Sequence, residues 1–577
     1  MGLRGQVPDN EATYEDPVLG VNLHDSEEDL RAGETSLMKN LVYFGGTVSR
    51  TGSNAITASQ VASSFGVKGG HKAYFNIPSQ NKARLIAYDT NISTITDGGF
   101  ETVIYSHQTS DLHTYFKTWS ITDEVYIANG TDPLLHYDGS FVGPVGSTNI
   151  RSASYAWTAS GSGTNEYYVR TAASGNPSLS DPTSTGGVWI NGTFATKGSL
   201  GSLAAGEWGY GDNDTLGYST VYVRLSDGTD PDTKSVGYVQ HMSATNVPGV
   251  SGVSAASQVI GLVDRLFAVT ENGIERTDPR DPTVWSNDSG WATFRPSQSG
   301  TFKAMIPHSV TGQDGEPING ALAITENSYY FFTGTDFGSD VTNGTASTGE
   351  DSSIIHIDDV GCFGPRSVTS VPGVGTFWLT NNKDVFYVPA GHSRGNIVGT
   401  RIVNTGNTST KGLESLRVSL AASAWMIYHE PYLMLGFPID SDNHPTYQYW
   451  MDMNRFRVNK QIPIWYGPMI GQTVLSVWQE NQQGDNALVA GEGNATTGVF
   501  VYNLRVPSVY SDKVGTSTNN LSMQMDTYLK SGGAPSREKY LEQLEIEMNN
   551  ISGSATCDIS DLSGTILTDV KIEKTFV

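Results

Sequence analysis

The sequence predicts an all-β repeat fold, and its spacing, strand pattern and composition each support that class. Short apolar triplets recur in the second half of the chain at almost constant steps of 56, 55, 56 and 55 residues. The triplets begin at Leu266, Leu322, Phe377, Leu433 and Leu488. Each is followed by a turn and a second strand rich in aromatic or β-branched residues, which favour sheets. The 64 glycines, 27 tyrosines and 16% charged residues are also typical of a protein built from strands and turns.

Two earlier copies of the pattern begin at Leu85 and Val125, 40 residues apart. A period of this size, with each unit made of short strands, indicates a repeat architecture. A unit of roughly 50 residues with about four strands fits one blade of a β-propeller. We therefore expect an all-β protein: a β-propeller of six to eight blades, with an inserted small β-domain and a C-terminal β-strand region.

The order of the segments follows from this repeat. The step from Val125 to Leu266 is too long for one period by roughly 85 to 100 residues, the size of a small domain. A Ser/Gly/Thr-rich tract opens that interval, and alternating strands are expected at 220–224 and 235–240. The expected organisation is an N-terminal arm at 1–60, the first blades at 61–146, an inserted β-domain at 147–245, the remaining blades at 246–519, and C-terminal strands at 520–577 that close the ring or contact neighbouring subunits.

Tryptophans mark the last two repeat units. Trp425, Trp450, Trp465 and Trp478 all lie in the regular repeats. Large aromatic side chains in such strands are usually buried between packed sheets. We interpret these four residues as core between blades and not as a ligand site.

Charge and cysteine content exclude several classes of function. The formal net charge is −24, and a chain this acidic is not expected to hold nucleic acid by neutralising phosphates. The two cysteines, Cys362 and Cys557, cannot form a disulfide framework; we expect two buried thiols, and a single bridge between them is the alternative. The first residues lack the apolar stretch of a signal peptide, and no run reaches the length of a membrane span. We therefore expect a protein made in a cytoplasm and soluble there, with no membrane insertion of its own.

The sequence offers no motif for catalysis. There is no HExxH and no Walker loop, and Gly252-Val-Ser254-Ala-Ala256 lacks the last glycine of a hydrolase elbow. A glycosidase needs two facing carboxylates, but the acidic residues cluster in strings typical of solvated turns. The prediction is a protein that is not an enzyme, with no catalytic residues and no cofactor.

Two acidic loops are the candidates for a metal site. The carboxylates are Asp212, Asp214, Asp227, Asp230 and Asp232. Hard oxygen ligands on a flexible loop are what Ca²⁺ prefers. Neither loop has the full twelve-residue pattern with its terminal Glu, so hydrogen bonding within turns is the alternative role for these side chains.

Short motifs along the chain resemble one protein family. The arm contains Leu30, Gly33, Asn40, Gly45-Gly46 and Arg50-x-Gly52; a typical blade spans 264–279 and is followed by Trp285; and the closing stretch is 537–547. These segments resemble the β-propeller tail proteins of short-tailed bacteriophages, known as tail tubular, nozzle or packaged-DNA-stabilisation proteins. The segment 211–232 also resembles a small β module that recurs in phage virion proteins.

That resemblance implies a structural role. It implies a subunit that associates with itself into a ring, a hexamer by family likeness, below the portal-adaptor complex. The ring would retain and then pass double-stranded DNA without binding it specifically, and it would support tail fibre or needle proteins. The implied location is the virion tail, assembled in the host cytoplasm. The alternative is a carbohydrate-binding or glycan-hydrolysing propeller, which would need an acidic pair at the centre of the disc.

Overall fold

The computed structural model describes most of the chain between residues 18 and 526, and a short segment near the end. The described residues are 18–25, 30–31, 34–43, 47–61, 63–75, 82–150, 155–171, 181, 186–235, 237–250, 252–271, 273–285, 300–312, 315–333, 353–403, 410–440, 442–458, 462–480, 487–493, 499–506, 509, 511–514, 517–521, 524–526, 555–561 and 564–572. By its internal contacts the chain forms two units, one spanning 14–528 and one formed by 1–13 and 529–577. Among the described residues no helix has both the length and the apolar character needed to span a membrane.

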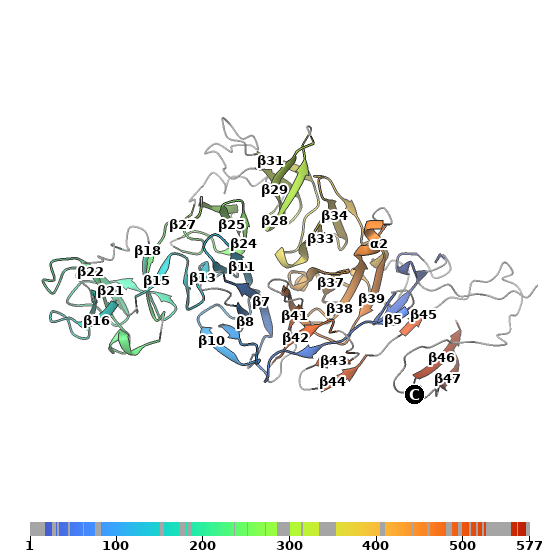
Figure 1. Cartoon of the computed structure of the whole chain (residues 1–577), viewed down its shortest axis with the longest axis horizontal. Helices are drawn as coiled ribbons and strands as arrows, with labels where there is room; N and C mark the ends of the chain where they lie inside the picture. The colour runs from blue at the N-terminus through green and yellow to red at the C-terminus, as the bar shows by residue number, and fades with distance from the viewer. Residues whose placement is uncertain are drawn as a thin grey trace, which may run out of the picture. The chain divides into compact units, whose positions relative to one another are not determined.

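Seven four-stranded antiparallel sheets form the blades of a β-propeller within the described residues (Figure 1). The first three blades are β7 (Val67–Tyr74), β8 (Lys82–Tyr88), β9 (Asn91–Ile95) and β10 (Glu101–Tyr105); β11 (Tyr115–Trp119), β12 (Glu124–Ala128), β13 (Leu135–Tyr137) and β14 (Val142–Pro144); and β24 (Ala256–Leu262), β25 (Arg265–Thr270), β26 (Gly273–Asp278) and β27 (Asp281–Trp285). The next three are β28 (Phe302–Thr311), β29 (Pro317–Thr325), β30 (Tyr329–Thr333) and β31 (Ser353–Asp358); β32 (Val368–Val371), β33 (Gly375–Leu379), β34 (Val385–Pro389) and β35 (Asn396–Ile397); and β36 (Trp425–His429), β37 (Tyr432–Phe437), β38 (Tyr447–Asp452) and β39 (Trp465–Met469). The seventh is β40 (Val474–Glu480), β41 (Ala487–Glu492), β42 (Val501–Leu504) and β6 (Asn54–Ala55).

The recurring triplets of the sequence occupy the second strand of every blade. The two early copies fall on β8 and β12, and the five regular copies fall on β25, β29, β33, β37 and β41. All residues of β25, β33 and β37 are buried. A strand covered on both faces is expected to be continuously apolar, as these triplets are. The expected propeller is therefore confirmed, with seven blades in the described part of the chain.

Neighbouring blades bury the four tryptophans that mark the last repeats. Trp425, Trp450, Trp465 and Trp478 are each at most 5% exposed. The indole NH of Trp425 donates to the backbone oxygen of Val474 in the next blade, at 3.0 Å. The interpretation of these residues as core between blades is confirmed.

The amino-terminal segment closes the ring. The first strands contact one another in the order β7, β11, β24, β28, β32, β36 and β40, and β40 returns to β7. The outermost strand of the seventh blade is β6, which pairs antiparallel with β42. The backbone NH of Ile56 donates to the oxygen of Val501 at 2.7 Å, and Val61 and Val499 exchange two such bonds at 2.8 and 2.9 Å.

One of the two roles expected for 520–577 is to close the ring, and the seventh blade shows a different closing strand. The end of the predicted arm at 1–60 supplies the outer strand of the seventh blade, and the described strands within 520–577 pair elsewhere. The physical reason is that β42 presents a free edge, and the segment at 54–61 reaches that edge in register before entering β7.

Several strands lie outside the blades, and three of them pack on the sixth blade. They are β1 (Gly20–Val21), β2 (Glu34–Thr35), β3 (Leu37–Lys39), β4 (Leu41–Tyr43) and β5 (Thr47–Ser49), with β43 (Ser511–Val514), β44 (Ser517–Asn520) and β45 (Gln524–Asp526). β1, β3 and β4 contact β39, and β3 pairs with β45. The Arg50 guanidinium contacts the Asp512 carboxylate at 2.5 Å, and both side chains are buried. This ion pair fastens the segment after β42 to the arm.

Short helical turns connect several strands. They are η3 (Pro231–Thr233), η4 (Pro365–Ser367), η5 (Thr400–Ile402), η6 (Leu413–Ser415), η7 (Val418–Ser423) and the α-helix α2 (Met453–Val458). Phe456 of α2 is fully buried, and its ring packs on Phe377 and Tyr387 of the fifth blade. α2 therefore joins the sixth blade to the fifth.

Two further sheets lie between β14 and β24 in the chain. One has the order β15 (Ser147–Asn149), β23 (Val239–Ser243), β18 (Gly186–Ile190) and β19 (Thr193–Phe194). The other has the order β16 (Tyr155–Ala159), β17 (Tyr167–Thr171), β22 (Thr220–Arg224), β21 (Glu207–Gly211) and β20 (Thr196–Lys197). Trp157, Val188, Trp208 and Val221 belong to a core that these sheets share. The inserted region thus has an apolar core of its own.

The carboxy-terminal unit contains one described hairpin. β46 (Ala555–Asp561) pairs antiparallel with β47 (Gly564–Ile572). Cys557 lies on β46. The other expected thiol, Cys362, is free and 1% exposed. The strand expected near 540–548 lies outside the described residues.

The junction of the inserted region predicts how it can be removed. Met242 and Ala244 belong to the apolar cluster between the second and third blades, and Gln240 bonds to Ser147 at 2.7 Å and to the Val142 oxygen at 3.1 Å. Replacing 150–239 by Asn-Gly leaves Asn149 opposite position 240, which is the geometry of a two-residue hairpin. We expect this variant to keep the melting temperature of the propeller, measured by circular dichroism.

A longer deletion is the matched comparison. Removing 147–245 also removes the buried side chain of Met242, and such losses cost about 2–5 kcal/mol in the free energy of unfolding. We expect this variant to unfold at lower denaturant than the Asn-Gly variant. Equal stability of the two deletions would show that Met242 is not part of the core of the disc.

Candidate ligand site at the axis of the propeller

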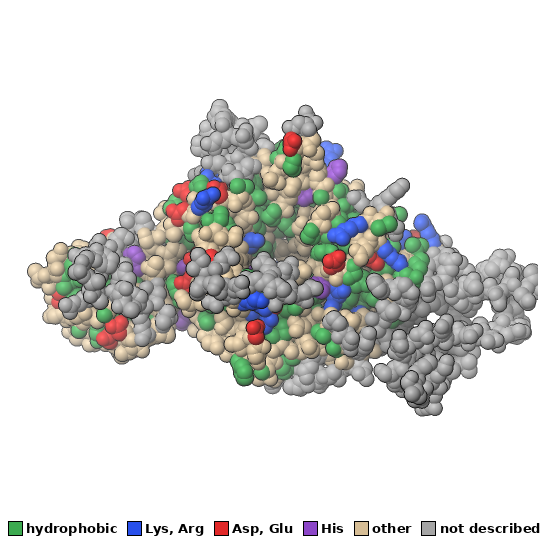
Figure 2. All heavy atoms as spheres, viewed as in Figure 1, with side chains coloured by type: hydrophobic (Ala, Val, Ile, Leu, Met, Phe, Trp, Pro, Cys, Tyr) green, Lys and Arg blue, Asp and Glu red, His purple; other side chains and the backbone are tan. Residues whose placement is uncertain are grey.

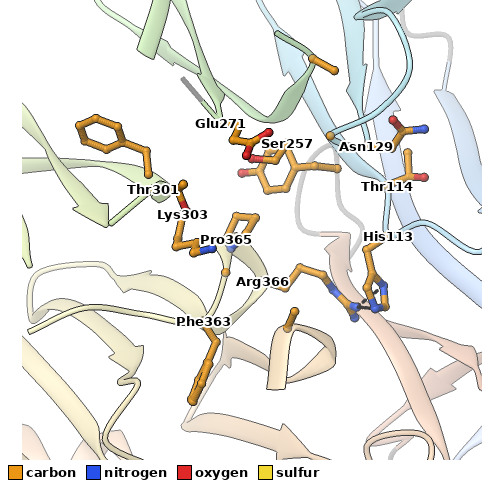
Figure 3. A pocket seen from close by; sticks show the side chains of 16 residues that line it. His113, Thr114, Asn129, Ser257, Glu271, Thr301, Lys303, Phe363, Pro365 and Arg366 are labelled. Atoms are coloured by element: carbon orange, nitrogen blue, oxygen red, sulfur yellow. Dashed lines mark hydrogen bonds between the residues drawn. The ribbon is translucent and has the colours of Figure 1, made fainter. Parts of the chain in front are cut away.

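A cavity of about 360 Å³ opens where five blades meet. In an antiparallel blade, the start of the first strand and the turn after the second strand emerge on the same face. The lining follows this rule, since it comes from the starts of β11, β24, β28, β32 and β36 and from the turns after β12 and β25 (Figure 3). Its polar and charged members include His113, Thr114, Asn129, Ser257, Glu271, Lys303 and Arg366.

Arg366 joins three blades at this point. It lies in η4, directly before the first strand of the fifth blade. Its guanidinium donates to the backbone oxygen of Leu475 in β40 and contacts the ring of His113, which precedes β11 (Figure 3). The fifth, seventh and second blades are therefore linked near the axis through one side chain.

His113 is neutral in this arrangement. Burial lowers the pKa of His113 well below its ordinary value, and the charges of Arg366 and Lys68 lower it further. The ring Nδ1 lies 3.4 Å from the Lys68 oxygen, and Nε2 lies 3.2 Å from Nη1 of Arg366. Nη1 of Arg366 lies closer to Nδ1, at 2.5 Å, and because a guanidinium only donates, the neutral ring of His113 accepts a hydrogen bond from Arg366.

Arg366 is a cation without a carboxylate partner among the described residues. Burial lowers the pKa of Arg366 to about 9, so the guanidinium stays charged at neutral pH. Its hydrogen-bond partners are a carbonyl oxygen and a neutral imidazole. The nearby Lys68 differs, because its Nζ lies 2.6 Å from the exposed carboxylate of Asp111.

Other cations lie on the first strands of the blades. Lys303 on β28 lines the same cavity. Lys117 on β11 has its pKa lowered by burial. Lys72 on β7 lies 3.3 Å from the Glu480 carboxylate, which also receives bonds of 2.6 and 2.8 Å from Arg84. In a chain of net charge −24, the axis is therefore a place where basic side chains gather.

The first candidate metal loop uses its carboxylates as turn acceptors. Asp212 accepts the backbone NH groups of Leu216 and Gly217 at 2.6 and 2.9 Å. Asp214 accepts from the Ser160 hydroxyl and from the Gly161 NH, each at 2.7 Å. Both side chains thus stabilise the loop between β21 and β22.

The second loop behaves in the same way. Asp227 accepts from the NH and hydroxyl of Thr229, Asp230 accepts from the NH of Asp232, and Asp232 accepts from the NH of Trp157. In the part of the chain that the structure describes, no group of three or more His, Cys, Asp or Glu side chains is placed to hold a metal ion. Asp212, Asp227 and Asp230 thus have the turn role given as the alternative, whereas Asp214 and Asp232 hold their loops to the segment 157–161.

The axial cluster has no signal in the amino-acid sequence. Arg366 and His113 are 253 positions apart, and neither lies in a recognisable motif. Only the seven-bladed ring brings the start of the fifth blade next to the start of the second. A single sequence could have indicated this pair only through the position of each residue just before a predicted first strand.

Of the comparisons with known proteins, only the one with solved structures returns matches. No protein-family model and no curated protein matches the chain. Solved structures similar to it include the WD40 β-propeller domain of Doa1, with a TM-score of 0.33 and 7% identity over 79% of this chain and 98% of that one. Others are YCF48 bound to D1 peptide, with a TM-score of 0.35 and 8% identity over 81% and 99%, and YCF48 from Cyanidioschyzon merolae, with a TM-score of 0.26 and 9% identity over 78% and 98%. The chain is a β-propeller.

The ion cluster on β40 predicts a pH effect on stability. Burial alone would raise the pKa of Glu480, but the bonds and charges of Arg84 and Lys72 outweigh it and hold that pKa below its ordinary value. The stabilisation is therefore present above about pH 4.5 and is lost as the pH falls through the lowered pKa. We expect Glu480→Gln to lose about 3–5 kcal/mol at pH 7, because two buried cations lose the carboxylate that they share.

Urea unfolding at pH 7 and at pH 4 or below checks this effect. The difference between the wild type and Glu480→Gln should narrow in acid. Glu414→Gln, an exposed position, is the control and should change stability by less than about 0.5 kcal/mol at either pH. A loss for Glu480→Gln that is the same at both pH values would contradict the charge-based explanation.

Proposed function

We propose that the chain is a structural subunit of a phage tail, a nozzle-type ring below the portal and adaptor. The observation that carries the proposal is a closed seven-bladed disc with three additions outside its blades. These additions are the strands that pack on β39, the inserted two-sheet domain and the carboxy-terminal hairpin. The sequence resemblance to such tail proteins supports the same role.

The stiffness of the disc suits a part of a channel wall. Aromatic rings pack between successive blades: Phe267 on Phe332 at 5.6 Å, and Tyr329 on Trp378 at 5.2 Å between ring centroids. Such pairs stabilise a seam beyond the area that they bury. A ring of subunits that must resist the pressure of a packaged genome requires rigid parts of this kind.

The additions outside the blades supply surfaces for assembly. A two-stranded hairpin is marginally stable by itself and needs further strands or a packing partner. β46 and β47 form such a hairpin among the described residues of the carboxy-terminal unit. We propose that this unit contacts neighbouring subunits, and that the inserted domain contacts a fibre or needle protein.

The charge distribution suits passage of DNA without a grip on it. Figure 2 shows acidic side chains dispersed over the visible face instead of gathered in one patch. Proteins bind a DNA duplex tightly when basic side chains neutralise its phosphates and release their counterions. A surface of net negative charge does not form such contacts. The proposed partners are further copies of this chain, the portal-adaptor complex, fibre or needle proteins and the DNA that passes through. The proposed location is the virion tail after assembly in a host cytoplasm.

The assembly itself is the first test. We expect the purified full chain, alone or with a portal-adaptor complex, to form rings that are hexameric by electron microscopy. A variant that ends at residue 528 should keep the β signal and melting of the propeller but lose ring formation, since it lacks 529–577. The Asn-Gly variant of 150–239 is the control and should still assemble. If the full chain remains monomeric in the presence of every portal-adaptor complex tested, the proposal is wrong.

DNA binding is the second test. We expect the assembled ring to retain double-stranded DNA weakly at about 0.15 M salt, because phosphate contacts around a bore would multiply into tight, salt-dependent binding. Filter retention or anisotropy at several salt concentrations measures this. Firm retention with a steep salt dependence would mean that basic residues line the bore, which would contradict the proposed passage of DNA without a grip on it.

A further inference from the structure

We infer that the axial cavity binds an oxyanion, a carboxylate or a phosphate, against the guanidinium of Arg366. This inference does not rest on the proposed role in a tail. It starts from the contrast between Arg366 and three paired cations near the axis. Arg84 and Lys72 share the carboxylate of Glu480, and Lys68 is paired with Asp111, whereas no ion pair of Arg366 occurs among the described residues.

A partly buried cation without an opposite charge is unfavourable. Removing a guanidinium from water costs solvation free energy, and a carbonyl oxygen and a neutral imidazole return only part of it. Arg366 also has five NH donors in a planar fork, a geometry that suits the two oxygens of a carboxylate or phosphate. An incoming oxyanion would therefore supply the opposite charge that the guanidinium of Arg366 lacks among the described residues.

The cavity provides room and further donors for such an anion. Lys303 from the fourth blade contributes a second cationic group, an ammonium, and the hydroxyls of Thr114 and Ser257 belong to the same lining. A volume of about 360 Å³ is ample for one anion with its first waters. Because the lining comes from five blades, a ligand here would contact most of the ring at once.

The other charged groups define what the site accepts. In Figure 3, the carboxylate of Glu271 points towards Ser257, while Arg366 and His113 lie together on the other side of the cavity. Of the lining residues that the structure describes, Glu271 alone carries a carboxylate. Its repulsion favours a ligand of low charge seated on the Arg366 side. His444 and Lys68 also act on His113, and Asp111 offsets the charge of Lys68.

Two sources could supply this chemistry, and the experiment separates them. The first arm titrates inorganic phosphate, and acetate in parallel, into the full chain. The second arm titrates a capped peptide with one Asp and one Glu, against the same peptide with Asn and Gln. Heat of binding and melting temperature are followed, with sodium chloride at equal ionic strength as the control for screening. A ligand of the folded state raises the melting temperature in a saturable way.

Variants assign the effect to the cavity. We expect Arg366→Gln to weaken the apparent affinity at least 10-fold, and Arg366→Lys to recover part of it, because the charge returns without the fork. Lys303→Gln should weaken binding a few-fold. Lys82→Gln, an exposed position on β8 away from this cavity, is the matched control and should bind as the wild type does.

Each outcome decides the inference. Saturable binding of phosphate or acetate supports a free anion as the occupant, and binding of the acidic peptide alone supports a side chain from a polypeptide. If Arg366→Gln does not fold, the affinities of Arg366→Lys and Lys303→Gln decide in its place. The inference is overturned if no probe binds beyond the chloride control, or if binding is unchanged in the folded Arg366 and Lys303 variants. Ring assembly is measured separately, so failure here leaves the proposed function intact.

Discussion

The fold depends on one constraint, which is that each blade has two apolar faces and both must be covered by neighbouring blades. An open row of blades would leave the faces of its first and last sheets in water, and an exposed apolar face of that size is costly. Closure removes both faces at once. In this chain closure is completed by the pairing of β6 with β42, so two residues near the start of the propeller, Asn54 and Ala55, secure the last blade. Arg50 precedes β6 and Asp512 follows β42, so the pairing of these two strands brings the two side chains together.

The same closure creates the chemistry at the axis. The first strand of every blade faces the others across a narrow space, so polar side chains on these strands meet partners that are remote in the sequence. Glu480 receives Arg84 and Lys72 in this way, across the boundary between the last and first blades. Arg366 reaches the second and seventh blades by the same geometry. The axis therefore combines a buried carboxylate that two cations share with a guanidinium that has no ion pair among the described residues.

The repeat can be predicted from the sequence because the packing of the blades requires it. The second strand of each blade is covered on both faces, and this burial imposes the apolar triplets that begin at Leu85, Val125 and the five regular positions. The closing strand cannot be predicted from an apolar pattern, because Asn54-Ala55 is held by backbone hydrogen bonds and needs no apolar side chain. The axial site cannot be predicted from the sequence for another reason. His113 and Arg366 acquire their roles from the ring and not from their neighbours in the chain. The acidic loops show the opposite problem, because Asp212 or Asp227 serves turn geometry with the same residue types that a metal site would use.

The charge of the molecule has different consequences at its surface and at its axis. Dispersed acidic side chains on the surface are screened over about 8 Å at physiological salt, so they act mainly on solubility and on a polyanion that passes close by. A buried guanidinium is screened much less, and its preference for a counterion is correspondingly stronger. An acidic chain can thus repel DNA along its exterior and still hold one small oxyanion at Arg366. If that oxyanion belongs to a polypeptide, the axial cavity becomes a point at which an acidic segment can be recognised by five blades together, and its contacts would stabilise the same ring closure on which the fold depends.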